Sequence, residues 1–365
     1  MKIMKTVTFT LIRLCLLVML VPAYSFAFQE EEDGVVNNYS PLTKAETARR
    51  FPLKYEGTFT SGELDHEEKL KQTLLSENVN IGVSGAKLTK RTIGEDDEEL
   101  VIVGLDKNNQ EWSVILGGTT VTHGFRFYTA DLDKNGIQDG VILAYTMGNG
   151  LAPTRHINTL TFDEVGRPVL FEIEGYFQEV DNGIFDVVDL NRDGRAEIIY
   201  MNHSAGYWVT NIYEINHARW QRIAGKHAER SYPLYTRFTN RPNRVAVAPK
   251  AGKHPTADDL SNVTPKISGQ LISYNWGKVS ESEDISLHVK GVNSRQIVCR
   301  PASWYSSFSV VIDNPEGRRV ISMSASEKTF RAGLDEVVKN KYDVTMFGQR
   351  GDEKPSPEIL WAVGK

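Results

Sequence analysis

Between residues 78 and 223, apolar and polar side chains alternate with a period of two, the spacing expected of half-buried β-strands. The alternating runs are rich in β-branched and aromatic residues, and short polar turns such as Asn108-Asn109 separate them. No segment between the runs is long enough for a crossover helix, so we expect antiparallel strands. The predicted strands span 100–105, 111–116, 125–130, 140–146, 158–162, 169–173, 184–190, 196–201, 207–215 and 219–223.

These strands group into repeated units. Two predicted units of four strands cover 124–175 and 184–223. We expect 78–117 to supply a third, degenerate unit and 232–248 to add one further strand. The predicted repeat domain therefore covers 78–246.

A change in amino-acid composition marks the start of a second domain. The segment 247–263 is polar and rich in Pro and Gly, which is typical of a linker. Beyond it, over 264–348, short strand-like runs return and predict a small β-sandwich. The predicted fold is therefore all-β, with 349–365 as a C-terminal tail. The runs of the predicted sandwich are 267–275, 285–289, 296–299, 308–312, 319–323 and 342–347.

The region before the strands, 28–77, is expected to hold an acidic leader and one helix. The leader contains the consecutive acidic residues 30–33. Thr60 and Glu63 have the spacing of a helix capping box, and leucines follow at helical spacing before Asn78.

The first 27 residues predict a signal peptide. A basic stretch precedes the apolar run 14–21, and Ser25 and Ala27 place small residues at positions −3 and −1 of a cleavage site before Phe28. The apolar run is shorter than the roughly 20 residues that a spanning helix needs. We therefore expect an exported protein, periplasmic or secreted to the cell surface, with no membrane span after cleavage. An uncleaved N-terminal anchor is the alternative.

Composition excludes several classes of function. The formal net charge is −5, and cleavage of the basic signal peptide makes it more negative, so nucleic acid is not an expected partner. One of the two cysteines, Cys15, lies in the signal peptide. The remaining Cys299 can form neither an internal disulfide nor a cysteine-rich zinc site.

One acidic loop occurs twice, 58 residues apart, and carries the clearest chemistry. Strand-like runs enter and leave each copy. Counted from the first Asp, oxygen-bearing side chains stand at positions 1, 3, 5 and 9, Gly stands at position 6, and position 7 can offer its backbone carbonyl. The candidate metal ligands are Asp131, Asp133, Asn135, Ile137 and Asp139 in the first loop and Asp189, Asn191, Asp193, Arg195 and Glu197 in the second.

This spacing matches the first nine positions of a calcium-binding loop. Each loop contributes three carboxylates, which repel one another without a cation, and such flexible oxygen ligands favour calcium over magnesium. Position 12, where an EF-hand places a bidentate Glu, is Ile142 or Tyr200. The pattern therefore predicts two calcium sites in hairpin loops. The alternative is a pair of turns whose Asp and Asn side chains cap their own backbone.

The loops and their flanking strands resemble the FG-GAP or VCBS repeats, the calcium-binding blade hairpins of integrin-α-type β-propellers, over about 120–225. In that family, loop positions 1, 3, 5, 7 and 9 bind calcium, which implies the same role for the ten residues named above. Because the chain has room for far fewer blades than such propellers use, the resemblance implies an incomplete or small β-propeller-like array.

Residues 264–348 resemble the bacterial pre-peptidase C-terminal type of β-sandwich. The similarity lies in the hairpin 308–318, which turns at Asn314-Pro315-Glu316-Gly317, and in the final strand that starts at Tyr342. This resemblance implies an accessory, non-catalytic module of a secreted protein.

The common hydrolase motifs are not found: Gly82-Val83-Ser84-Gly85 is not a G-x-S-x-G elbow, and His66-Glu67 lacks the second His of H-E-x-x-H. The predicted function is therefore that of an exported calcium-binding β-repeat protein, a non-catalytic binding or scaffolding module. Its partner would be an extracellular or envelope protein or a glycan. Two alternatives stay open: a secreted hydrolase acting on a glycan or phosphoester, and a structural subunit of an envelope assembly.

Overall fold

The structure is a computed structural model, and most of its described residues lie in β-strands. The signal peptide 1–27, the capping-box helix, the linker 247–263 and the tail 349–365 lie outside the described residues. No helix among the described residues has both the length and the apolar character needed to cross a membrane. The described residues are 44–59, 77–93, 97–117, 124–145, 155–177, 179–180, 183–204, 207–237, 266–279, 282–290, 297–299, 308–314, 317–322 and 325–348.

A five-stranded antiparallel sheet, here called the middle sheet, has the order β1-β6-β7-β8-β9. Strands β6 to β9 are consecutive in the chain, so the four-stranded unit predicted over 124–175 is confirmed. Strand β1 comes from well before this unit and pairs with its β6 edge. The bounds are β1 Lys54–Phe59, β6 Phe125–Ala130, β7 Asp139–Tyr145, β8 Arg155–Phe162 and β9 Pro168–Gly175.

The second sheet has the order β12-β13-β14-β15, with β18 also paired to β14. It confirms the unit predicted over 184–223. Two short hairpins, β10 with β11 and β16 with β17, flank it in the sequence. The bounds are β10 Glu179–Val180, β11 Gly183–Ile184, β12 Val187–Val188, β13 Glu197–Ser204, β14 Tyr207–Asn216, β15 Arg219–Ile223, β16 Gly225–His227, β17 Arg230–Tyr232 and β18 Leu234–Arg237.

The expectation for 78–117 was wrong. Its strands do not form a separate unit but join the C-terminal strands in one ten-stranded sheet. The junction is a parallel pairing of β5 with β23, in which Val114 lies opposite Val320. The sheet order is β2 Asn78–Val79, β3 Ala86–Ile93, β4 Asp97–Leu105, β5 Glu111–Leu116, β23 Gly317–Ser322, β22 Phe308–Asn314, β24 Asp343–Gly348, β19 Lys266–Val279, β20 Ser282–Val289 and β21 Ile297–Cys299.

The C-terminal region also differs from the predicted sandwich. All its described strands belong to the ten-stranded sheet, and α5, Glu327–Asn340, covers one face of that sheet. The helix is amphipathic: Phe330, Leu334 and Val337 are buried against sheet residues that include Ile312 and Ile321. A helix therefore fills the place of the expected second sheet. The only other helix of the described residues is the four-residue α2, Lys44–Thr47.

Leu334→Ala tests how much this helix contributes. Leu334 is 1% exposed, so its truncation is expected to lower the free energy of unfolding by about 2–5 kcal/mol. Lys328→Ala on the exposed face of α5 is the control and should change it by less than about 0.5 kcal/mol. Urea unfolding measures both variants, and equal effects would contradict the docking of α5.

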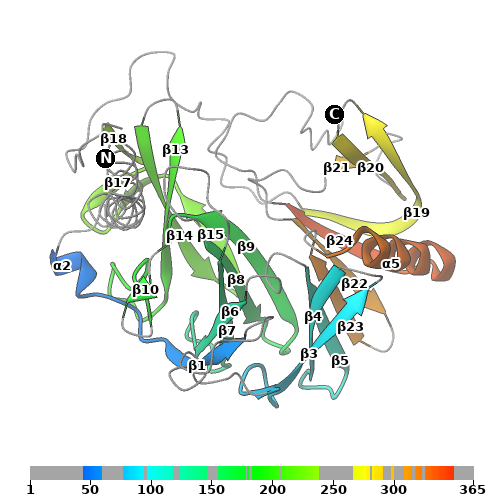
Figure 1. Ribbon diagram of the computed structural model, residues 1–365, viewed down its shortest axis with the longest axis horizontal. Helices are drawn as coiled ribbons and strands as arrows, with labels where there is room; N and C mark the ends of the chain where they lie inside the picture. Colours follow the sequence, from blue (N-terminus) through cyan, green and yellow to red (C-terminus); the bar gives the residue numbers. More distant parts are fainter. Residues whose placement is uncertain are drawn as a thin grey trace, which may run out of the picture.

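The middle sheet is buried on both faces, because it lies between the other two sheets (Figure 1). In β7, Ile142 and Ala144 belong to the core shared with the ten-stranded sheet, whereas Val141 and Leu143 belong to the core shared with the second sheet. This explains why β7 reads as a continuous apolar run. Helix α5 lies on the outer face of the ten-stranded sheet.

The segment before β1 ties the second sheet to the middle sheet. Its backbone N–H at Phe51 donates to the carbonyl of Val187, and the N–H of Asp189 donates to the carbonyl of Arg49, both at 2.9 Å. The chain then continues into β1 on the middle sheet. Residues 49–59 therefore span the two sheets that carry the acidic loops.

Candidate metal centre

The two acidic loops have the same backbone conformation. The first joins β6 to β7 and the second joins β12 to β13, so strands flank both loops, as the sequence predicted. At position 4, Lys134 and Arg192 have positive φ values of 61° and 63°. At position 6, Gly136 and Gly194 both have a φ of 85°, a conformation that favours glycine. The glycine that both loops have at position 6 therefore has a backbone cause.

The loops also share their internal hydrogen bonds. The carboxylate at position 1 accepts bonds from the backbone N–H groups of positions 5 and 6, at 3.0 Å in both cases for Asp131 and 3.1 Å in both cases for Asp189. The carboxylate at position 9 accepts from the N–H of position 2, at 2.8 Å for Asp139 and 2.7 Å for Glu197. Each loop therefore wraps its backbone around inward-pointing carboxylates.

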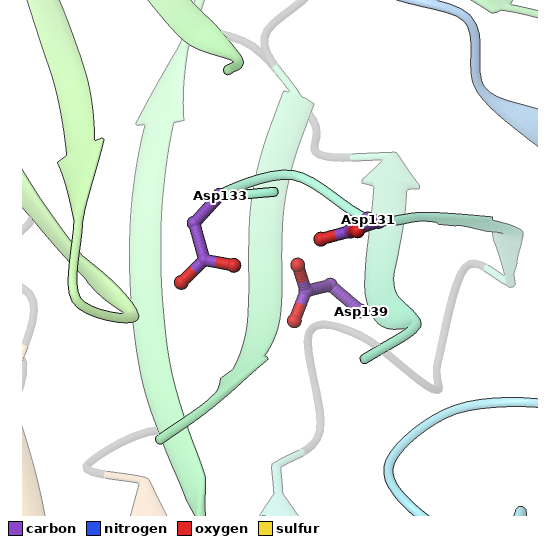
Figure 2. A group of neighbouring side chains, drawn as sticks. All are labelled: Asp131, Asp133 and Asp139. Atoms are coloured by element: carbon purple, nitrogen blue, oxygen red, sulfur yellow. The ribbon is translucent and has the colours of Figure 1, made fainter. Parts of the chain in front are cut away.

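In the first loop, three carboxylates converge. One carboxylate oxygen from each of Asp131, Asp133 and Asp139 lies within 4.8 Å of the others, and Figure 2 shows the side chains facing one another. Asp139 is completely buried. The Oδ1 atoms of Asp133 and Asp139 are both buried and accept no hydrogen bond. A buried carboxylate oxygen without a donor is costly, and a cation between these groups would satisfy both oxygens.

The electrostatics of this cluster disfavour three negative charges. Burial raises the pKa of Asp139 well above its usual value, the charges of Asp133 and Asp131 add to the increase, and the Leu132 N–H opposes it. Burial also raises the pKa of Asp133, against the hydrogen bond from the Ala218 N–H and together with the charge of Asp131. The ionised cluster is therefore unfavourable unless a positive charge joins it.

The other two predicted ligands of the first loop, Asn135 and Ile137, add no carboxylate to the cluster. The Asn135 side chain fixes the loop: its oxygen accepts from the Ile137 N–H at 2.7 Å, and its amide nitrogen donates to the Phe162 carbonyl at 2.9 Å. The Ile137 side chain is buried in the core shared with the ten-stranded sheet. Ile137 can therefore offer a cation only its backbone carbonyl.

The first loop touches all three sheets. The Gly82 N–H, just before β3, donates to the Gln138 carbonyl at 2.8 Å. The Ala218 N–H, in the turn between β14 and β15, donates to Asp133 Oδ2 at 2.9 Å. Adjacent to this contact, the Thr161 hydroxyl of the middle sheet donates to the Ala218 carbonyl at 2.6 Å. The position of the Asp133 carboxylate therefore depends on packing between sheets.

The second loop does not form a matching cluster. Among the described residues, the only group of three or more possible ligand side chains within such distances is the one in the first loop. In the second loop, Asp193 Oδ2 accepts from Arg195, at 3.0 Å from Nε and 2.7 Å from Nη2. Glu197 Oε1 lies 2.9 Å from Nε2 of His227, whose pKa is raised by this contact. These two carboxylates therefore have partners within the chain.

The loop pattern predicts neither of these partners. It indicates only a backbone carbonyl at Arg195, although an Arg two residues after Asp193 is a local signal for an ion pair. His227 lies 30 residues after Glu197 and meets it only through the fold, so no local pattern indicates its role.

Comparisons with known proteins supply no relative for this chain. No family model matches it, and neither a curated protein nor a solved structure matches it. The geometry of the two loops is therefore the basis for assigning a function.

Proposed function

We propose that this protein is an exported calcium-binding β-repeat protein that acts as a non-catalytic binding or scaffolding module, with its calcium site in the loop 131–139. The observation that carries the proposal is the pair of buried oxygens, Asp133 Oδ1 and Asp139 Oδ1, which have no hydrogen-bond donor and belong to carboxylates that converge with that of Asp131. A cation supplies the positive charge that these oxygens lack.

The donor set favours calcium. The three side chains offer only carboxylate oxygens, and calcium takes six to eight oxygen ligands from carboxylates, carbonyls and water. Nitrogen and sulfur ligands, which favour zinc and copper, are absent from the group of Asp131, Asp133 and Asp139. The Ile137 carbonyl and water would complete the coordination. Bound calcium would neutralise most of the cluster's charge and hold the loop in shape.

The place of the site in the fold supports a structural role. Hydrogen bonds connect this loop to Gly82, between β2 and β3 of the ten-stranded sheet, and to Ala218, between β14 and β15 of the second sheet. Calcium at this point would stabilise contacts between sheets. Two antiparallel units with matching loops also support the proposal that they are repeats of the FG-GAP or VCBS type, stacked in a small propeller-like array. In this proposal, the surface they build binds an extracellular or envelope protein or a glycan.

Calcium-dependent stability tests the proposal. The full chain should melt at a higher temperature with millimolar calcium than with chelator, because a ligand that binds only the folded state stabilises it. The gain is about 4 kcal/mol at a free concentration a thousand times the dissociation constant. Magnesium at the same concentration should give a smaller shift. Equilibrium dialysis should detect bound calcium, and the proposal fails if dialysis finds none and the melting temperature does not move.

A further inference from the structure

The two loops share a backbone but differ in what surrounds their carboxylates. In the second loop, hydrogen bonds reach every carboxylate oxygen. Both oxygens of Asp189 accept from backbone N–H groups, and those of Asp193 accept from the Arg195 backbone and side chain. Glu197 meets the Leu190 N–H through one oxygen and His227 through the other. In the first loop, by contrast, two buried oxygens have no donor.

We propose that the second loop is held without a metal ion: Arg195 and His227 take the place of the divalent cation, and the chain binds a single calcium ion, in the first loop. The calcium count rests on the proposed function, whereas the role of Arg195 and His227 rests only on the contacts of the second loop.

The two basic side chains and the acidic groups around them form a continuous network. Arg195 Nη2 lies 3.7 Å from Glu214 Oε1, and His227 Nδ1 lies 3.8 Å from Glu214 Oε2. Glu214, on β14, therefore faces both basic groups, while Asp193 and Glu197 contact one each. The side chain of His227 is only 8% exposed and that of Glu197 1% exposed, so this contact is shielded from water.

Position 7 explains why the loops diverge. In the first loop, this position is Ile137, whose side chain packs in the core and carries no charge that could balance the carboxylates. In the second loop, it is Arg195, whose guanidinium forms two hydrogen bonds to one carboxylate oxygen of Asp193. A cation that is covalently part of the chain stays when calcium is withdrawn. The second loop should therefore keep its shape in chelator, and calcium binding should be non-cooperative.

Counting bound ions tests this inference. Equilibrium dialysis of the full chain against radioactive calcium should give one ion per chain with a Hill coefficient of one. Asp131→Asn should abolish binding, whereas Asp189→Asn, the same change at the same loop position, should leave one ion bound. A count of two overturns the inference, and so does loss of binding in Asp189→Asn with retention in Asp131→Asn.

Melting in chelator separates this inference from the proposed function. Arg195→Ile, which introduces the residue found at position 7 of the first loop, and His227→Gln should each lower the melting temperature by several degrees. Lys226→Gln, an exposed neighbour of His227, is the control and should leave it unchanged. If the wild type binds no calcium, the proposed function fails, but the melts in chelator still test the role of Arg195 and His227. If both variants melt at the same temperature as Lys226→Gln, that role is overturned.

Discussion

Asp139→Asn is expected to have opposite effects with and without calcium. In calcium, the variant should lose the calcium-dependent stabilisation, about 4 kcal/mol at a free concentration a thousand times the dissociation constant, because the buried ligand oxygen loses its charge. In chelator, it should melt at a higher temperature than the wild type, because the neutral amide avoids the cost of either ionising or protonating Asp139 beside the other two carboxylates. The amide oxygen can still accept the Leu132 N–H. Thermal melts in both conditions measure this reversal.

Asp163→Asn is the matched control for this reversal. Asp163 also lies in a hairpin turn of the middle sheet, where its Oδ1 accepts from the N–H groups of Val165 and Arg167. It does not belong to the converging cluster, so its calcium-dependent shift should equal that of the wild type. A calcium shift that survives in Asp139→Asn would show that the convergence of the three carboxylates has another cause.

Glu99→Ala is expected to lower the free energy of unfolding by about 2–4 kcal/mol, because it removes several hydrogen bonds to a buried charge. The Glu99 side chain, on β4, is almost completely buried. Its carboxylate accepts from the Ser326 N–H at 2.8 Å and from the Thr329 hydroxyl at 3.0 Å, both at the start of α5. Arg91 on β3 pairs with the same carboxylate at 2.7 Å. Loss of Glu99 therefore removes these two hydrogen bonds between the start of α5 and strand β4.

Two further variants distinguish the hydrogen bonds of Glu99 to α5 from a general effect of truncating a side chain. Glu99→Gln keeps an oxygen acceptor and should cost less than Glu99→Ala. Glu111→Ala, at an exposed position of the neighbouring strand β5, should stay within about 0.5 kcal/mol of the wild type. Urea unfolding followed by circular dichroism gives the three values. Equal values for Glu99→Gln and Glu99→Ala would mean that the hydrogen bonds to α5 contribute little.

Much of the local structure could be predicted because short-range patterns encode it. The strands β5, β6 and β15 have the predicted bounds, since alternation and turn residues mark both ends of each strand. The matching loops could also be recognised, because Gly at position 6 and Asp at position 1 determine their backbone locally.

Helix α5 was missed although its signal is local. The Ser326 side chain caps the helix by accepting a hydrogen bond from the Thr329 N–H, and the buried residues of α5 recur at helical spacing. The strand-like runs on either side of this segment favour a β-sandwich, and that prediction was wrong although the segment itself carries the signature of a helix.

The sequence alone therefore determined most strands between 100 and 223 and the backbone of the two loops, because alternation and turn residues are local patterns. It did not indicate β1, which lies where a leader and a helix were expected. Only the tertiary structure decided which strands of distant segments pair, as β5 does with β23. It also decided which acidic loop keeps unpaired carboxylate oxygens. Asp133 meets Ala218, and Glu197 meets His227, only after the sheets have packed. Two loops with the same spacing of oxygen-bearing side chains thus differ in charge balance for two reasons: Arg195 pairs locally with Asp193, and different parts of the fold lie against the two loops.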